Sequence, residues 1–152
     1  MGIEINMLQR FLLPLGAALL LVLGGCQQDV DDSTQVTEAQ LQALQKRVEE
    51  RWQARIAHDW GKAWEYSSPA YREVFPKRLY VKKFSYTADW ELTGIEVTNY
   101  DPSAAVASVV VRVMSRPTKQ TSAAAKALGA MPRNLHERWI LIDGEWWFSA
   151  NY

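Results

Sequence analysis

The dipeptide Asp143-Gly144 lies between two apolar runs near the carboxyl end of the chain. Asp-Gly in this setting is typical of a two-residue type I′ hairpin, because both turn residues need a positive φ. The sequence therefore predicts antiparallel strands over 135–142 and 145–152, with a register fixed by the turn. The predicted pairs are Ile142 with Glu145, Leu141 with Trp146, Trp139 with Phe148, Glu137 with Ala150, and Leu135 with Tyr152.

One face of this hairpin is apolar except for Glu137, and alternation along the strands directs that face into the core. A carboxylate beside Trp139 and Tyr152 would be poorly solvated, an environment that suits a general acid or base. Two structural interpretations stay open and are favoured: Glu137 lies at the sheet end, or it pairs with an arginine such as Arg72 or Arg138.

A helical part precedes the strands. Thr37 and Gln40 match a capping box, and apolar residues then recur every three or four positions, which predicts a helix over 38–58. Its apolar face comprises Leu41, Leu44, Val48, Trp52 and Ile56. After a break near residue 60, Ser68 and Pro69 begin another short helix as N-cap and first-turn residue.

The middle of the chain has the two-residue period of strands. A strand is expected over 90–100, with a bulge at Gly94, and a second over 104–116. The apolar face of the second strand comprises Ala105, Ala107, Val109, Val111 and Val113. Residues 117–134 form a polar excursion with a helical turn that ends near Gly129.

Helices followed by an antiparallel sheet make an α+β fold, with amino-terminal helices packed on a curved antiparallel sheet. The pattern resembles the NTF2-like (SnoaL-like) superfamily. The resemblance covers the domain 37–152 and is carried by the helical run 52–64, the segment 66–72 and the hairpin 137–148. It implies a cone with a pocket between helices and sheet. The pocket candidates are Tyr71, Glu137, Trp139 and Tyr152.

The amino-terminal segment has a different character. Arg10 precedes the uncharged apolar run Phe11–Leu23, and Gly24, Gly25 and Cys26 follow it. Thirteen apolar residues are too few for a bilayer, which takes about 20, but they fit the apolar region of a signal peptide.

This order resembles the lipobox of bacterial prolipoproteins. The resemblance implies a signal peptide over 1–25, cleavage between Gly25 and Cys26, and acyl chains on Cys26. Residues 26–36 would then be an acidic tether, with about 17 Å between the ends of its ten flexible residues. Gln27 at the second mature position favours the outer membrane, facing the periplasm. Translation starts at Met1 or, because Glu4 is unusual in a signal, at Met7.

Composition excludes several kinds of chemistry. Cys26 is the single cysteine, so an intramolecular disulfide and a downstream thiol nucleophile are excluded. Seventeen basic and 17 acidic residues cancel, which argues against nucleic-acid binding, although a local basic patch can hide in the sum. No metal-ligand spacing and no cofactor motif is found.

The sequence leads to two functional hypotheses. The first is a non-catalytic envelope lipoprotein, held on the membrane through lipid on Cys26, that binds a protein or a small apolar ligand. Ile140 and Trp147, on the sheet face opposite Glu137, are its candidate interface. The alternative is an NTF2-like enzyme that uses Glu137 as general acid or base in an aromatic pocket.

Overall fold

The computed structural model describes residues 36–84, 88–118 and 122–150. Four helices come first: α1 (Glu38–Ile56), α2 (Trp60–Glu65), α3 (Pro69–Val74) and α4 (Lys77–Phe84). They are followed by β1 (Ala88–Asp101), β2 (Val106–Pro117), α5 (Ala123–Leu128), β3 (Met131–Ile142) and β4 (Glu145–Phe148). The signal peptide, the lipobox and the tether predicted for 1–35 lie outside the described residues.

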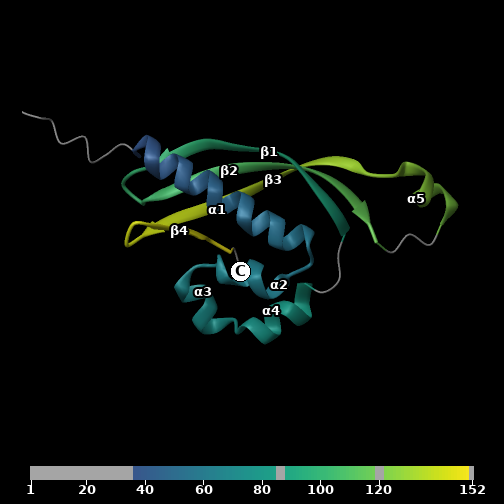
Figure 1. Ribbon diagram of the computed structural model, residues 1–152, viewed down its shortest axis with the longest axis horizontal. Helices are drawn as coiled ribbons and strands as arrows, with labels where there is room; N and C mark the ends of the chain where they lie inside the picture. The colour runs from purple at the N-terminus through teal and green to yellow at the C-terminus, as the bar shows by residue number, and fades with distance from the viewer. Residues whose placement is uncertain (1–35, 85–87, 119–121, 151–152) are drawn as a thin grey trace, which may run out of the picture. The chain divides into compact units, whose positions relative to one another are not determined.

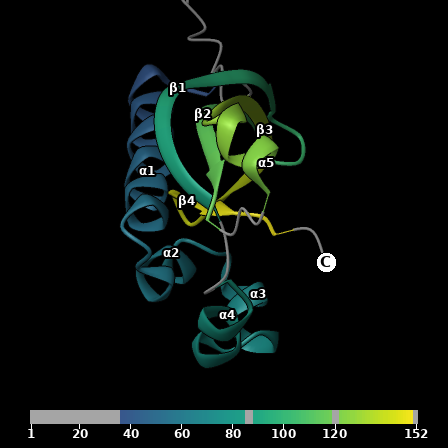
Figure 2. The ribbon, with the colours of Figure 1, turned by 90° about the vertical axis from the view of Figure 1, so that its right-hand side faces the viewer.

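The strands form one antiparallel sheet in the order β1-β2-β3-β4 (Figure 1). Helix α1 lies along one face of this sheet, and Figure 2 shows β1 as a strongly curved strand beside α1. The predicted fold class, amino-terminal helices packed on a curved antiparallel sheet, is therefore confirmed.

The helix boundaries follow from the capping residues. The Thr37 side chain accepts from the backbone of Gln40, whose own side chain accepts from the backbone of Thr37, so the predicted capping box is present. Helix α1 ends at Ile56 rather than at residue 58, because His58 has a φ of 58° and cannot continue a right-handed helix. Ser68 caps α3 as expected, with Pro69 in its first turn.

The hairpin turn has the predicted geometry. Asp143 and Gly144 have φ values of 51° and 78°, and the register pairs Ile142 with Glu145 and Trp139 with Phe148. The expected bulge at Gly94 is present as a register shift between Leu92 and Gly94.

The last strand is shorter than predicted, and the next-to-last is longer. Strand β4 ends at Phe148, so the predicted pairing of Glu137 with Ala150 does not form, and Ala150 packs instead on the second apolar cluster. The outer edge of β4 bonds to the segment before α3: Phe148 N donates to Tyr66 O at 2.8 Å. Strand β3 begins at Met131 because its early residues pair with β2 beyond the predicted start.

Ala105 also departs from its prediction. It lies in the β1–β2 turn with a φ of 50° instead of continuing the apolar face of β2. The other four predicted residues of that face are buried: Ala107, Val109, Val111 and Val113.

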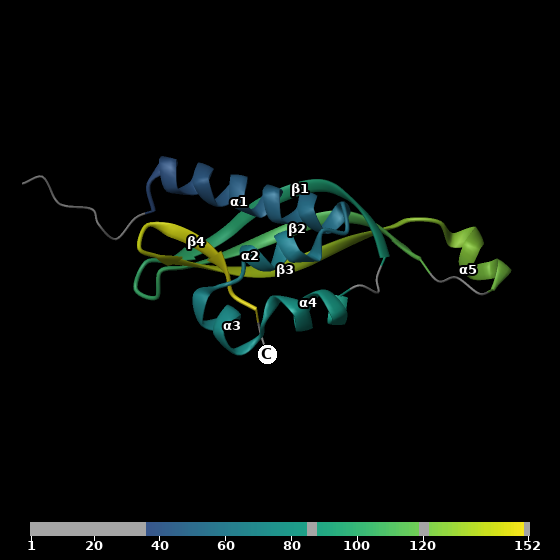
Figure 3. The ribbon, with the colours of Figure 1, turned by 60° about the horizontal axis from the view of Figure 1, so that its bottom comes forward.

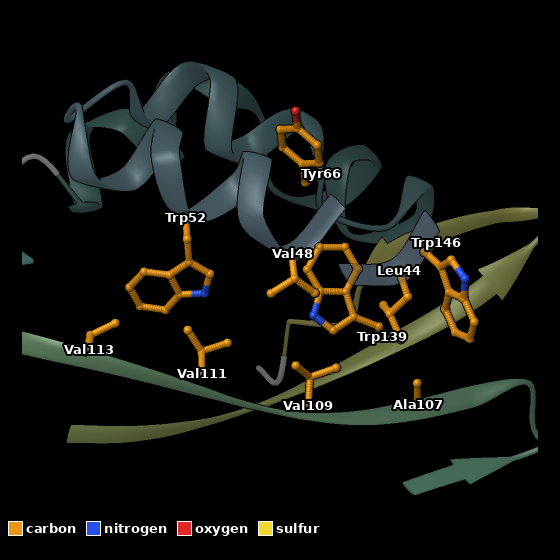
Figure 4. Packing of buried hydrophobic residues seen from close by; sticks show 10 residues of the cluster. All are labelled: Leu44, Val48, Trp52, Tyr66, Ala107, Val109, Val111, Val113, Trp139 and Trp146. Atoms are coloured by element: carbon orange, nitrogen blue, oxygen red, sulfur yellow. The ribbon is translucent and has the colours of Figure 1, made fainter. Parts of the chain in front are cut away.

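Two apolar clusters stabilise the fold. The main cluster lies between α1 and the sheet (Figure 4) and comprises Leu44, Val48, Trp52, Tyr66, Ala107, Val109, Val111, Val113, Trp139 and Trp146. The second joins the end of α1 to the short helices and comprises Ala54, Trp60, Ala63, Tyr71 and Tyr80. Figure 3 shows α2, α3 and α4 grouped beside the sheet.

Candidate functional site

Glu137 lies on the core face of β3 and is only 6% exposed. Arg51 Nη1 donates to Glu137 Oε1 at 2.6 Å, and the Arg51 side chain is itself 2% exposed. Trp52 Nε1 donates to the same oxygen at 3.0 Å, and Trp139 Nε1 donates to Oε2 at 3.0 Å. Donors that the fold holds in place therefore engage both carboxylate oxygens.

Arg55 adds a second positive charge beside this carboxylate. Its Nη1 lies 3.9 Å from Glu137 Oε1, and its guanidinium lies between the rings of Trp52 and Trp90, at 4.2 and 4.3 Å from their centroids. Burial, and then the neighbouring charge of Arg51, lower the pKa of Arg55 to about 10, while Glu137 opposes that shift. Arg55 therefore remains protonated at neutral pH.

The arginines reach this position because α1 repeats them every fourth residue. Arg47, Arg51 and Arg55 lie along one line of the helix, beside its apolar stripe. Each contacts an aromatic ring: the Arg51 guanidinium lies 3.6 Å from the centroid of Phe148. An arginine packed on a ring buries its stem and gains a cation–π interaction, which offsets part of the cost of desolvating the charge.

The charges do not balance within this cluster. Arg51 and Arg55 bring two positive charges to a single carboxylate, and the Nε atoms of both are buried without a hydrogen-bond partner. The remaining favourable contacts of the two guanidinium groups are those with aromatic rings. We conclude that the cluster holds one carboxylate and two guanidinium groups in place. Proton transfer to a substrate would need the Glu137 carboxylate to be accessible to that substrate.

The structure describes three of the four pocket candidates, and it brings two of these together. Trp139 lies beside Glu137 and donates to it, whereas Tyr71 belongs to the second apolar cluster. Tyr152 lies outside the described residues, as do Gly25 and Cys26.

The arginines expected as partners of Glu137 are not the ones observed. Arg138, adjacent on β3, is exposed on the opposite face of the sheet. Arg72 lies over Trp64 and Trp147, at 5.5 and 4.7 Å from their centroids.

Arg51 and Arg55 are not among the predicted site residues. Their signal was available: arginines spaced by four, adjacent to the apolar stripe of a helix, together with one acid on the core face of a strand. The sequence pattern does not show that α1 packs against β3, because about 85 residues separate the contacting side chains in the chain.

Ile140 and Trp147 pair across β3 and β4, as predicted. Both are partly buried and lie on the sheet face opposite Trp139. Trp147 is held at the sheet edge between two guanidinium groups, those of Arg47 and Arg72, at 4.8 and 4.7 Å.

A groove elsewhere on the domain does not include Glu137 among its lining residues. It measures about 510 Å³ and runs between α1 and β1, where Leu41, Gln45, Ile95 and Val97 contribute to its walls. Among the described residues, no group of three or more His, Cys, Asp or Glu side chains is placed to hold a metal ion. No helix in that part of the chain is long and apolar enough to cross a membrane.

Comparisons with known proteins give little further information. No family model matches the chain, and no curated protein matches it. Among solved structures, the chain is similar to the solution structure of a SEC-C motif containing protein from Rhodopseudomonas palustris. That similarity has a TM-score of 0.40 at 17% identity, over 66% of this chain and 70% of the other.

Proposed function

We propose that this chain is an envelope lipoprotein, anchored through acyl chains on Cys26 and facing the periplasm, whose domain is a non-catalytic binding module. Four sequence features that occur together support the lipid anchor: a basic flank, an apolar run of signal length, two small residues and the single cysteine. Two or three acyl chains hold a protein stably on a bilayer, whereas one binds only marginally.

The environment of Glu137 supports a binding role over an enzymatic one. A general acid or base must come within hydrogen-bond reach of the substrate. Glu137 instead accepts three hydrogen bonds from Arg51, Trp52 and Trp139 within the core. We also propose that the domain belongs to the NTF2-like superfamily, for which helices packed on a curved antiparallel sheet are the expected architecture.

The sheet face opposite α1 is the proposed binding surface. It carries Ile140 and Trp147 side by side, both partly exposed, with the partly exposed Val106 opposite Ile140 on β2. Apolar side chains gathered on a sheet face are typical of a protein interface, and here the guanidinium groups of Arg47 and Arg72 lie beside the Trp147 ring at its edge.

Replacement of the cysteine tests the anchor. Cys26→Ser should abolish incorporation of a fatty-acid analogue and leave the precursor uncleaved, because the thiol that accepts the acyl group is gone. Normal labelling and processing of Cys26→Ser would disprove the lipoprotein assignment.

Site-specific crosslinking tests the binding surface. A photo-crosslinking residue in place of Ile140 should give a discrete adduct in intact cells. The same residue in place of Thr93, an exposed position on β1, is the matched control. Equal adducts from both positions, or none from Ile140, would refute the assignment of this face.

A further inference from the structure

The two edges of the sheet differ in what covers them. The outer side of β4 is bonded to the segment before α3, because Phe148 N donates to Tyr66 O at 2.8 Å and Ser68 N donates to Phe148 O at 3.0 Å. Strand β1 lies at the other edge, and among the described strands it pairs with β2 alone. The backbone N–H and C=O groups of β1 that point away from β2 can therefore bond to an added strand.

A groove follows this edge. It is the groove of about 510 Å³ between α1 and β1, and it is lined by every residue from Ile95 to Tyr100 and, on α1, by Glu38, Leu41 and Gln45. Successive side chains of a strand point to opposite faces, so a groove lined by consecutive residues follows the backbone edge rather than one face. Figure 2 shows α1 and β1 next to each other on this side of the domain. A helix on one side and an unpaired strand edge on the other make the kind of groove in which a peptide adds a strand to a sheet.

The two faces of β1 have opposite chemistry. The inner face is apolar, and its partly buried residues pack against the main cluster: Trp90, Leu92, Ile95, Val97 and Tyr100. The outer face, which pairs with the outward residues of β2, carries four exposed acids: Asp89, Glu91, Glu96 and Asp101. Directly opposite side chains on adjacent strands interact, so these two faces determine which residues suit an added strand.

Some of the acids already have partners. Glu96 pairs with Arg112 of β2, and an Asp89 oxygen lies 3.6 Å from His58 Nε2. Both pairs are about half exposed, and the four acids outnumber the two arginines, Arg112 and Arg116, on the same face of β2. The outer face of β1 therefore still favours cations in a neighbouring strand.

The same charges disfavour a second copy of this strand. No basic residue lines the groove, whereas Glu38 and Glu96 both do. The β1 strand of a second copy would bring another row of acids beside the first, and like charges on adjacent strands are destabilising.

We propose that the β1 edge binds an extended peptide segment of a partner protein in which apolar residues alternate with lysine or arginine. The apolar side chains enter the groove beside Leu41, next to Ile95 and Val97. The cations lie on the outer face next to Glu96. Backbone hydrogen bonds to β1 supply the affinity, and the alternation of side chains supplies the specificity.

Two irregularities limit the length of the added strand. The register of β1 on β2 shifts between Leu92 and Gly94 and again between Val97 and Asn99. Such bulges protect an edge strand from open-ended pairing, so a short segment is the expected occupant. Thr93 lies at the first shift and is not among the lining residues of the groove.

A synthetic peptide tests the proposal. The experiment uses the full-length protein, purified in a nonionic detergent, and a fluorescently labelled peptide of about eight residues that alternates valine and lysine. Fluorescence anisotropy should show saturable binding. The same peptide methylated at its backbone nitrogens keeps its side chains but loses its donors, so it should bind at least about tenfold more weakly. Peptides with serine in place of valine, or glutamate in place of lysine, should also bind about tenfold more weakly.

Variants of the apolar wall identify the groove. Leu41→Ser should weaken binding of the valine–lysine peptide about fivefold, because it removes an apolar contact from the α1 side. The matched control is Leu79→Ser, at a 40% exposed position on α4 outside the groove, which should leave the affinity within about twofold of the parent. Circular dichroism confirms that each variant is folded.

A second pair of variants tests the charges. Glu38→Gln/Glu96→Gln should weaken binding of the same peptide about fivefold. Glu49→Gln/Glu73→Gln removes the same charge from exposed positions outside the groove and should leave the affinity within about twofold.

The inference is overturned by the absence of saturable binding, by equal binding of the methylated, serine or glutamate peptide, or by equal losses in the control variants. A dimer in sedimentation velocity that Leu41→Ser dissociates would assign the groove to a second copy and would equally overturn it. The labelling of Cys26 and the crosslinking at Ile140 do not depend on this groove, so failure here is distinguishable from failure of the proposed function.

Discussion

Glu137 illustrates how one acidic residue can fix the position of a helix on a sheet. Arg51 and Trp52 reach its carboxylate from α1, and Trp139 reaches it from the same strand. A shift of α1 by one turn would bring another arginine to the place of Arg51, but Val48 or Ile56 would replace Trp52, so Glu137 Oε1 would lose its indole donor. We infer that the cluster specifies how α1 sits on the sheet, as well as stabilising it.

Neutralising this carboxylate should destabilise the protein strongly. Glu137→Gln keeps the size of the side chain but leaves Arg51 and Arg55 without a buried counter-charge, so we expect a loss of about 3–5 kcal/mol in the free energy of unfolding. Urea denaturation measures it. The control is Glu96→Gln, which breaks the half-exposed pair with Arg112 and should cost less than about 1 kcal/mol. Similar losses in the two variants would contradict the buried ion-pair assignment.

The hairpin between β3 and β4 depends on the backbone conformation of its turn. Gly144 has a φ of 78°, and a Cβ added there would meet no atom within 4 Å, so the cost of a side chain is conformational rather than steric crowding. Gly144→Ala should therefore lower the free energy of unfolding by about 1–2 kcal/mol. Asp143→Asn is the control, because asparagine tolerates the positive φ at that position. An unchanged urea midpoint in Gly144→Ala would contradict the turn assignment.

The β1–β2 turn should respond to acid through Asp101. The Ser103 hydroxyl and the backbone of Ala104 donate to its carboxylate and hold the pKa of Asp101 below its ordinary value. A lowered pKa means that this contribution is present above the unfolded-state pKa and is lost as the pH falls through the folded-state pKa. Asp101→Asn should therefore lose less stability than the parent between neutral and strongly acidic pH. The urea midpoints of Asp101→Asn and of the parent, each measured at the two pH values, test this prediction. An equal change of midpoint with pH in the two proteins would disprove the contribution of Asp101.

At the level of the whole domain, we predict that the chain from Gln27 onward folds without the proposed signal peptide and Cys26. The described members of both apolar clusters lie between residues 36 and 150. Because this chain retains the described members of both clusters, it should have the urea midpoint and m-value of the lipidated protein. A lower m-value in the shorter chain would show that the amino-terminal segment adds to the folded core.

Strand β4 shows what a local sequence pattern does not predict. The Asp-Gly turn fixed the register of the four pairs that form, but Phe148 also bonds on its outer side to Tyr66 and Ser68. Ser149 N still donates to Arg138 O of β3 at 2.8 Å, and Ala150 then packs on the second apolar cluster. The 66–68 segment and the second cluster are distant from these residues in the chain, so periodicity alone could not reveal either contact.

The sequence by itself determined the features that depend on near neighbours: the capping box at Thr37, the hairpin turn, the bulge at Gly94 and the buried face of β2. Each follows from backbone geometry or from the period of apolar residues within a few positions. Only the tertiary structure decided that Glu137 meets Arg51 and Arg55. The choice among the arginines of the chain depends on how α1 packs across the sheet, and that packing is a property of the whole core rather than of any local segment.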